Sequence, residues 1–298
     1  MNITVFICTY NRGQLISGTL QSIIEKQNKK PDEIVIVNGG GENNCKKTLD
    51  YWKTKYDPII VVDTKNINLA VSRNIGLSYC SGDVILQTDD DARPHANWIS
   101  SMVKFHKKYP SAGVIGGTVI DGSRLSFLSQ VADATTFPRY NSMQSVRSVP
   151  GVNSSYKKEA ILQVGKYDET LFRGEDVDYN WRVKLNGWEI FYVPTIKVDH
   201  IHRSTWRDLF KQHFMYGRAH YLVRLKWPEM YSHYPLKINS LKSVFKWFAS
   251  WSVIPFLDAK LKARRVNKII NGFDILIILS INISNRIGTA YQQWLKSF

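Results

Sequence analysis

Short apolar segments alternate with amphipathic segments through the first 90 residues of this chain. The apolar segments have the length and the Val and Ile content of buried strands, and the segments between them have helical periodicity. The predicted strands are 3–8, 33–37, 59–62 and 84–86, and the predicted helices between them are 15–24, 45–56 and 69–78. Alternation of this kind predicts an α/β fold with a largely parallel sheet and helices on both faces. We expect the ligand crevice at the carboxyl ends of these strands.

Beyond residue 96 the pattern is less regular. A helix is predicted over 97–109 and a strand over 114–120. Asp121–Val149 then has no clean period and is rich in Ser, Thr and Arg. Such a stretch is either an insertion that faces a substrate or a surface loop, and the sequence leaves both open. Regular segments return as helices over 157–164 and 177–185 and as strands over 189–193 and 196–198.

Three consecutive carboxylates, Asp89, Asp90 and Asp91, follow the predicted strand at 84–86. Adjacent anions repel each other, so a buried cluster of this kind is stabilised by a cation. Carboxylate oxygens are the ligands that hard divalent cations prefer. A solvated acidic turn in front of the next helix accounts for the same residues, so the pattern alone supports a metal site and a polar turn equally.

Basic residues are concentrated in the last third of the chain. The formal net charge is +15, and residues 201–298 contain 16 Lys or Arg against 4 Asp or Glu. No helix-turn-helix, zinc finger or RNA-binding aromatic motif accompanies them, so we expect no nucleic-acid partner. The same third contains five of the nine Trp and two strongly apolar segments, Val244–Leu257 and Ile275–Ile283. An anionic membrane surface is therefore the predicted partner of this region.

Neither apolar segment has the ~20 apolar residues that a membrane-spanning helix needs. Flanking Trp, Lys and Arg are typical of helices that lie in the membrane interface. Helices that dock on the rest of the chain, or that form the contact of an oligomer, would have the same composition, and the sequence leaves these two possibilities open.

The cysteines indicate a reducing compartment. Cys8, Cys45 and Cys80 are scattered and have no metal-ligand spacing, which does not suit a disulfide framework. Met1 leads directly into the first predicted strand, without the features of a secretory signal. We expect a cytoplasmic protein that is peripheral on the cytoplasmic face of the membrane.

Six motifs occur together in the order typical of one enzyme family. They are VFICTYNR, EIVIV with a polar turn, NLAVSRNIGL, GDVILQTDDDARP, GVNSSYKKEAILQVGKYDETLFRGEDVDYNWRVKLNG and VDHIHRS. In this combination the chain resembles the GT-A glycosyltransferases of family 2. The resemblance implies a Rossmann-like GT-A catalytic domain over residues 1–218, with a nucleotide-sugar half at about 1–120 and an acceptor half at about 121–218. Residues 219–298 would then form a basic, aromatic, helical C-terminal extension.

Asp89 and Asp91 match the outer positions of the family's D-x-D motif. The resemblance implies that they bind Mn2+ or Mg2+, which neutralises the diphosphate of the donor as the glycosidic bond breaks. Residues two apart in an extended backbone point to the same side, so Asp90 would point away. His200 resembles a histidine that completes the metal site in several GT-A enzymes. His202 is the competing ligand, and a histidine satisfied within the core accounts for either residue.

The Glu175-Asp176 pair resembles the family's ED motif, in which the Asp is the general base. Inverting transfer needs a carboxylate opposite the leaving group that accepts the proton of the attacking hydroxyl. An acidic pair also suits the first turn of a helix, where the helix dipole stabilises negative charge. Within the order of the other motifs, we predict base catalysis by Asp176.

The resemblance also implies contacts with a nucleotide-sugar donor. The predicted donor-binding residues are Thr9, Tyr10, Arg12, Asn38, Arg73, Asn74 and Asp89. The first three match positions near the base and ribose, and Arg73 and Asn74 match positions near the diphosphate. Relatives usually carry two aspartates where this chain has Asn38-Gly39, so the contact with the base differs. UDP is favoured as the donor nucleotide, and GDP or dTDP remain open.

The sequence thus predicts a metal-dependent inverting glycosyltransferase that acts on a hydroxyl of a glycan or lipid-linked acceptor. One alternative is a nucleotidyltransferase that makes sugar nucleotides on a related fold. Such enzymes usually carry a Gly-rich loop with a basic residue after the first strand, and residues 9–12 do not supply one. The other alternative is a non-catalytic sugar-binding or membrane-binding module, against which the intact Asp89, Asp91, Asp176 and His200 argue.

Overall fold

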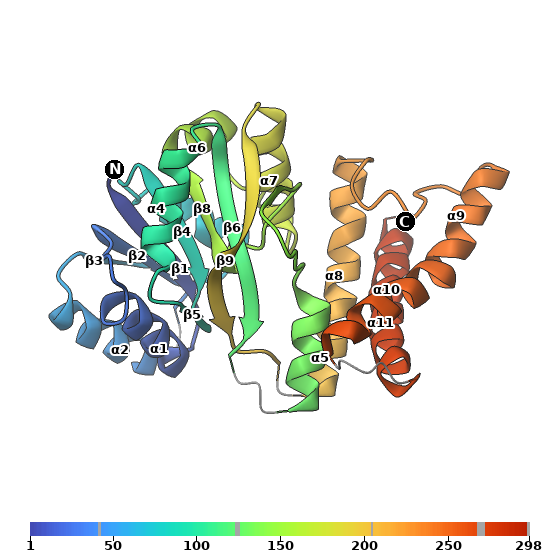
Figure 1. Cartoon of the computed structure of the whole chain (residues 1–298), viewed down its shortest axis with the longest axis horizontal. Helices are drawn as coiled ribbons and strands as arrows, with labels where there is room; N and C mark the ends of the chain where they lie inside the picture. The colour runs from blue at the N-terminus through green and yellow to red at the C-terminus, as the bar shows by residue number, and fades with distance from the viewer. Residues whose placement is uncertain (41–42, 123–125, 204, 267–271, 297–298) are drawn as a thin grey trace. The chain divides into compact units, whose positions relative to one another are not determined.

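The computed structural model of the protein describes residues 1–40, 43–122, 126–203, 205–266 and 272–296 (Figure 1). It contains two compact units. The first unit comprises Met1–Gly122 and Pro138–Ile201, and the second comprises Ser123–Phe137 and His202–Phe298. The predicted domain boundary near residue 218 therefore falls inside helix α8 (Trp206–Lys226), which belongs to the second unit.

The first half of the first unit is the predicted alternation of strands and helices. Its elements are β1 (Ile3–Thr9), α1 (Gly13–Ile24), β2 (Glu33–Asn38), α2 (Asn43–Lys55), β3 (Ile59–Asp63), α3 (Leu69–Leu77) and β4 (Val84–Asp89). The strands pair in parallel in the order β3-β2-β1-β4. The side chains of β1, β2 and β4 are buried on both faces of the sheet, which explains their continuous apolar runs. The predicted α/β class is confirmed.

The second half of this unit extends the sheet with mixed pairing. Its strands are β5 (Ala92–Pro94), β6 (Ala112–Asp121), β7 (Gln144–Ser145), β8 (Ser154–Lys157) and β9 (Glu189–His200). β8 joins β4 to β6 by antiparallel pairing, while β6 and β9 are parallel. The sheet is thus parallel in its first half and mixed in its second. The sequence does not reveal this difference, because β8 is short and polar and lacks the apolar run of the other strands.

Strand β9 continues through Pro194, although the sequence predicts two separate strands. Gly117 of β6 pairs with Val193, but Thr118 pairs with Lys197, so residues 194–196 form an irregular bulge. Proline has no N–H for the strand ladder, and the bulge accommodates it. The strand therefore extends to His200, which pairs with Asp121 of β6.

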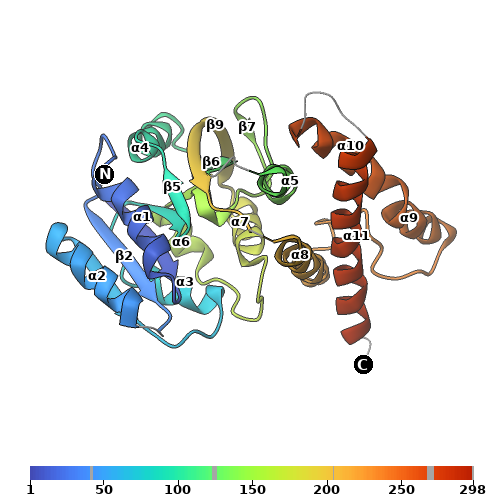
Figure 2. The same ribbon diagram turned by 90° about the horizontal axis from the view of Figure 1, so that it is seen from below.

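Helices cover both faces of the sheet (Figure 2). α3, α6 (Lys158–Val164) and α7 (Glu175–Leu185) share one hydrophobic cluster that includes Ala70, Ala160, Tyr179 and Val183. α1 packs on α2, and the side chain of Gln27, just beyond α1, accepts a hydrogen bond from the start of α4 (Trp98–Lys108). Because β1, β2 and β4 pair in parallel, their carboxyl ends lie at the same edge of the sheet.

All regular elements among the described residues of the second unit are helices. Its helices are α5 (Phe127–Thr136), α8, α9 (Leu241–Trp251), α10 (Val253–Val266) and α11 (Gly272–Leu295). α8 and α11 lie side by side (Figures 1 and 2). Each contributes a glycine to the contact, since a Cβ at Gly217 would collide with the backbone of Asn285 and a Cβ at Gly288 with that of Phe214. No described helix combines the length and the apolar character needed to cross a bilayer.

Helix α5 lies within the stretch Asp121–Val149, for which the sequence predicts no regular structure. Ser126 and Ser129 form a reciprocal capping box at its start, and Val131 and Ala132 pack into the core of the second unit. The signal is therefore present in the sequence, as a serine cap before apolar residues at helical spacing. Residues 123–125 of the stretch lie outside the described residues.

Candidate functional site

The acidic cluster lies where β4 ends and the short strand β5 begins. Asp89 is the last residue of β4, in register with Cys8 of β1. β5 pairs antiparallel with the end of β9, so that Ala92 lies opposite His200. Two segments more than 100 residues apart therefore meet at this edge of the sheet.

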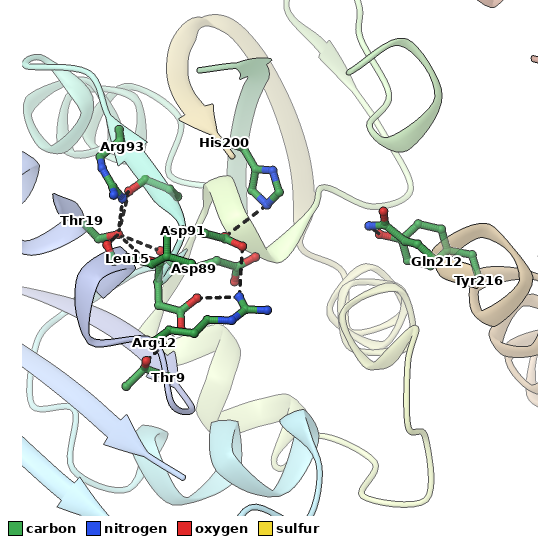
Figure 3. Close-up of polar contacts among 12 residues, drawn as sticks. Thr9, Arg12, Leu15, Thr19, Asp89, Asp91, Arg93, His200, Gln212 and Tyr216 are labelled. Atoms are coloured by element: carbon green, nitrogen blue, oxygen red, sulfur yellow. Dashed lines mark hydrogen bonds and ion pairs between the residues drawn. The ribbon is translucent and has the colours of Figure 1, made fainter. Parts of the chain in front are cut away.

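Asp89, Asp91 and His200 form a compact group of potential metal ligands (Figure 3). One ligand atom from each residue lies within 4.8 Å of the others, and His200 Nε2 is 3.2 Å from Asp91 Oδ1. Burial, and then the charge of Asp91, raise the pKa of Asp89 to about 6. Two carboxylate oxygens and an imidazole nitrogen are suitable ligands for a divalent cation such as Mn2+. The charge of the cation would reduce the repulsion between Asp89 and Asp91.

Asp90 lies outside this group, but Asp90 and Asp91 form a turn and not the extended backbone assumed from the sequence. Its carboxylate accepts hydrogen bonds from Thr9 Oγ1 (2.8 Å) and Arg12 Nη1 (3.0 Å). Arg12 Nη1 also lies 3.1 Å from Asp91 Oδ2, so one guanidinium contacts two of the three carboxylates. Burial raises the pKa of Asp90, and Arg12 opposes that shift. Asp90 therefore stabilises the turn that follows Asp89 and contains Asp91.

Thr19 of α1 holds the same turn from the other side (Figure 3). Its hydroxyl lies 2.7 Å from the carbonyl oxygen of Asp90 and 2.8 Å from that of Ala92, and it accepts a hydrogen bond from Arg93. No sequence pattern indicates this role, because a threonine inside an amphipathic helix carries no motif.

Asn38 and Tyr10 lie at the ends of β2 and β1. Asn38 is buried, and its Nδ2 donates a hydrogen bond to Asp63 Oδ1 at the end of β3 (2.7 Å). Tyr10 is 47% exposed and its ring lies beside Gly39. Thr9 pairs with Asn38 across the two strands. These predicted donor-binding residues are therefore neighbours, and their contact with a nucleotide stays a prediction.

Arg73 and Asn74 are engaged within the protein. Arg73 is buried, and its Nη1 lies 2.5 Å from Glu175 Oε1. Although burial lowers the pKa of the Arg73 guanidinium, the charge of Glu175 raises it above its usual value. Asn74 donates to the Tyr167 carbonyl (3.0 Å) and to Glu169 (2.8 Å). Their predicted contact with the donor diphosphate stays a prediction.

Asp176 lies in the first turn of α7. Gly174 precedes the helix with φ of 79°, a backbone conformation that favours glycine. Asp176 Oδ2 accepts a hydrogen bond from the Gly151 backbone N–H (3.2 Å), and its Oδ1 from that of Val177 (2.8 Å). The charges of Glu175, Asp176 and Asp89 all raise the pKa of the buried Arg73.

His202 does not belong to the group formed by Asp89, Asp91 and His200. It lies in the second unit, where its Nε2 is 3.7 Å from Asp133 Oδ1 and its ring lies beside Phe137. In the parts of the chain that the structure describes, His200 is thus the only histidine found in a cluster suited to a metal ion.

Comparisons with known proteins agree with this architecture. The chain matches the family model described as Glycosyl transferase family 2 over residues 4–165. It is 30% identical over 244 residues to a glucosyl-dolichyl phosphate glucuronosyltransferase of Haloferax volcanii, which covers 71% of this chain and 77% of the relative. It is 24% identical over 231 residues to a poly-beta-1,6-N-acetyl-D-glucosamine synthase of Staphylococcus aureus, covering 75% of this chain but only 56% of that relative.

A solved structure extends the similarity to nearly the whole chain. The fold is similar to that of a mannosyltransferase of Pyrobaculum calidifontis in complex with GDP-Man and Mn2+, with a TM-score of 0.68 at 14% sequence identity. The match covers 99% of this chain and 88% of that one, and at this identity it concerns the fold alone. The GT-A fold and the glycosyltransferase class predicted from the motifs are confirmed. The chain belongs to glycosyl transferase family 2.

Proposed function

We propose that this glycosyltransferase is metal dependent and inverting, with Asp176 as the general base. The observation that carries the proposal is the convergence of Asp89, Asp91 and His200, whose ligand atoms lie within 4.8 Å of one another. Asp89 and Asp91 come from β4 and the following turn, and His200 comes from the end of β9. A structural acidic turn would not require a histidine from a distant strand.

These positions support the following reaction. The acceptor hydroxyl attacks C1 of the donor sugar opposite the leaving diphosphate, and Asp176 accepts the hydroxyl proton as the new C–O bond forms. The bond from C1 to the diphosphate oxygen breaks, and the nucleoside diphosphate leaves with the electron pair. Asp89, Asp91 and His200 would hold a divalent cation, which would supply Lewis-acid stabilisation of that charge. Hydrogen bonds from the backbone N–H groups of Gly151 and Val177 orient the base.

The donor base is selected near Asn38. Because Asn38 Nδ2 donates to Asp63, the amide is oriented so that Oδ1 is the remaining acceptor, and that buried atom has no hydrogen-bond partner among the described residues. A base that presents an N–H, such as uracil, thymine or guanine, satisfies it, whereas the cytosine N3 would face it with a lone pair. UDP remains the first choice, with GDP or dTDP next. Tyr10, half-exposed beside Gly39, would stack on the base.

The acceptor is a hydroxyl of a glycan or of a lipid-linked glycan. One similar protein is named for a dolichyl phosphate substrate.

The second unit binds the cytoplasmic face of an anionic membrane. α9 supports membrane binding because its apolar face is directed outward: Phe245 is 66% and Phe248 61% exposed, while Ser243 and Ser250 are buried. Lys242 and Lys246 on the same helix are exposed and would contact anionic headgroups.

The base is tested with Asp176→Asn. We expect kcat to fall about 10²–10⁴-fold because the variant cannot accept the proton, with donor binding unchanged. Release of nucleoside diphosphate is measured with UDP-, GDP- and dTDP-linked sugars, Mn2+ and polyprenyl-phosphate-linked glycans. The matched control is Asp50→Asn, since Asp50 is exposed on α2. Turnover of Asp176→Asn within a few-fold of wild type would contradict the assignment.

Two further measurements test the rest of the proposal. The anomeric configuration of the product, read by proton NMR, should be opposite to that of the donor sugar; retention would refute an inverting mechanism. Thermal-shift assays with Mn2+ should show stabilisation by UDP, GDP or dTDP that exceeds stabilisation by CDP, since binding raises stability with ligand concentration. Preferential stabilisation by CDP would contradict the role given to Asn38.

A further inference from the structure

A buried glutamine connects strand β4 to the predicted base. The Gly151 backbone N–H donates a hydrogen bond to Asp176 Oδ2 (3.2 Å). The carbonyl oxygen of the same glycine accepts a hydrogen bond from Gln87 Nε2 (3.3 Å). Gln87 is 3% exposed and lies on β4, two residues before Asp89. The strand that carries a predicted metal ligand is therefore connected to the base through one intervening residue.

The two partners of the Gln87 amide determine its orientation. A carbonyl oxygen only accepts hydrogen bonds, so that of Gly151 requires the amide nitrogen. The amide oxygen then faces the Tyr167 hydroxyl, which donates to it at 3.2 Å. The Tyr167 hydroxyl also forms a hydrogen bond with that of Tyr156, and a hydroxyl can donate to one partner while it accepts from another. Both ends of the glutamine amide are thus engaged.

Helix α7 holds Tyr167 as well as the base. Tyr167 is buried, and its ring stacks on that of Tyr179 with centroids 4.0 Å apart. Tyr179 lies on α7, the helix whose first turn contains Asp176. The Arg73 guanidinium lies 5.5 Å from the centroid of the Tyr167 ring. Tyr167 is therefore held on several sides, and Gln87 connects it to the Gly151 peptide.

Gly151 is packed tightly against its neighbours. A Cβ at this position would lie 2.5 Å from Arg73 Nη2 and 2.6 Å from Gln87 Nε2. In a close-packed interior, a shift of Gln87 is transmitted to the peptide that it contacts. Ser154 Oγ also donates to the Gly151 carbonyl oxygen (3.2 Å), so this acceptor keeps a partner when Gln87 is replaced. Loss of Gln87 should therefore displace Gly151 without unfolding the unit.

We propose that Gln87 is a positioning residue for the general base, which rests on the role proposed above for Asp176. Gln87 holds the Gly151 peptide in the orientation that directs its N–H at Asp176 Oδ2. A displacement of about 1 Å can cost about 100-fold in rate, so a residue that acts only on the position of the base can control kcat. Because Gln87 and Asp89 share β4, the same strand also positions the base relative to the predicted metal ligands.

The test compares variants that remove buried hydrogen bonds at nearly constant volume. Gln87→Met removes both hydrogen bonds of the amide and should lower kcat about 10–100-fold, with the KM for the donor unchanged. Tyr167→Phe removes only a hydroxyl and should lower kcat less. The matched control is Tyr192→Phe, which removes a buried hydroxyl 2.7 Å from Thr118 Oγ1 in the same unit and should retain kcat. Release of nucleoside diphosphate is measured with UDP-, GDP- and dTDP-linked sugars, Mn2+ and polyprenyl-phosphate-linked glycans.

Two readouts separate positioning from a general loss of stability. Gln87→Met should lower kcat no further in the Asp176→Asn background, because it acts through Asp176. In the metal-free protein, hydrogen–deuterium exchange of peptides from 149–157 should be about tenfold faster in Gln87→Met, as expected when one hydrogen bond of ordinary strength is lost. Tyr167→Phe is tested in the same two ways, so the conclusion does not depend on whether Gln87→Met folds.

The outcomes distinguish this role from that of the base. Wild-type turnover of Asp176→Asn would overturn both. If Asp176→Asn lost turnover but Gln87→Met and Tyr167→Phe kept the wild-type kcat, only the positioning role would be wrong. Equal effects of Gln87→Met with and without Asp176, or an equal loss of kcat in Tyr192→Phe and Tyr167→Phe, would also overturn the positioning role alone.

Discussion

The first unit brings three adjacent carboxylates together at the end of β4, whereas the second unit contains two partly buried arginines, Arg224 and Arg286, that form no ion pair in the described part of the chain. Among the described residues at the end of β4, Arg12 is the arginine that pairs with the acidic cluster, through Asp90 and Asp91. In the second unit, Arg224 and Arg286 have no carboxylate partner in the described part of the chain. The overall charge follows the same division, since most of the net +15 belongs to residues 201–298.

This difference concerns the balance of charge within each unit. A surplus of buried acceptors is relieved by a cation, and a surplus of buried donors is relieved by an anion. The pair formed by Arg73 and Glu175 shows the balanced case, because each charge is buried and each has its partner. The comparison is therefore tested by removing one charge of this pair and by reducing the excess negative charge of the acidic cluster.

The largest expected effect is on the balanced pair. Arg73→Met leaves Glu175 as a buried carboxylate without a partner, which should reduce the free energy of unfolding by about 3–5 kcal/mol. Urea denaturation of the full chain provides the measurement. Arg73→Met combined with Glu175→Gln removes both charges and should recover much of the loss. If the free energy of unfolding of Arg73→Met fell by less than about 1 kcal/mol, Arg73 and Glu175 would not stabilise each other as a buried ion pair does.

The acidic cluster should respond in the opposite direction. Asp91→Asn removes a charge that raises the pKa of Asp89, after burial, and so should leave the metal-free protein as stable as wild type or more stable. The same change should weaken Mn2+ binding at least about 100-fold, because one ligand is lost. Isothermal titration with Mn2+, and melting in EDTA, measure the two effects. Destabilisation without metal together with normal Mn2+ affinity would show that the cluster is a structural turn.

The two units should also respond to acid to different degrees, because among the described residues the second unit has three histidines with lowered pKa values and the first unit has one, His106, whose pKa burial lowers to about 3. In the second unit burial lowers the pKa values of three histidines to about 3 or 4: His213, His220 and His233. When unfolded they take up protons below about pH 6.5, so stability falls as the pH falls below 6.5, by up to about 1.4 kcal/mol per pH unit for each histidine. In the first unit burial raises the pKa values of Asp90 and Glu175, which adds stability at low pH that is lost as the pH rises through the folded-state values.

Hydrogen exchange of separate peptides at pH 7 and pH 5, corrected for intrinsic rates, measures this contrast. Peptides from α8 and α11 should lose protection at pH 5, while those from β1 and β4 keep it. His220→Phe should reduce the acid sensitivity of α8, since it removes one of the proton-binding groups. Earlier loss of protection in β1 and β4 would contradict the predicted order.

The sequence predicted the first unit better than the second for a physical reason. Strands buried on both faces carry long apolar runs, and the motifs around Asp89, Asp176 and His200 stand at strand and helix ends, where chemistry requires fixed residues. The bulge at Pro194 and the antiparallel strand β8 depend on contacts between distant segments, which local patterns do not encode. The partner of Arg73 is hidden for the same reason, because Glu175 lies 102 residues away.

In the second unit the sequence indicated the basic and apolar composition but not the arrangement. The outward direction of Phe245 and Phe248 depends on which face of α9 is covered, and the buried Ser243 shows that the polar face is the covered one. The partial burial of Arg224 and Arg286 is also hidden, since an arginine in a basic sequence carries no sign of burial.

The smallest expected effect concerns the exposed lysines of α9. Lys242→Gln and Lys246→Gln should each weaken binding to vesicles that contain anionic lipid, by about 1 kcal/mol at low salt, because a lysine near such a surface contributes about that much. Flotation with phosphatidylserine vesicles at two salt concentrations measures it, with Lys53→Gln in the first unit as the control. Phe245→Ser should weaken binding at both salt concentrations, since it removes apolar contact instead of charge. If all three variants of α9 bound like wild type, the outward apolar face would have a partner other than an anionic membrane, and the proposed role of α9 would be wrong.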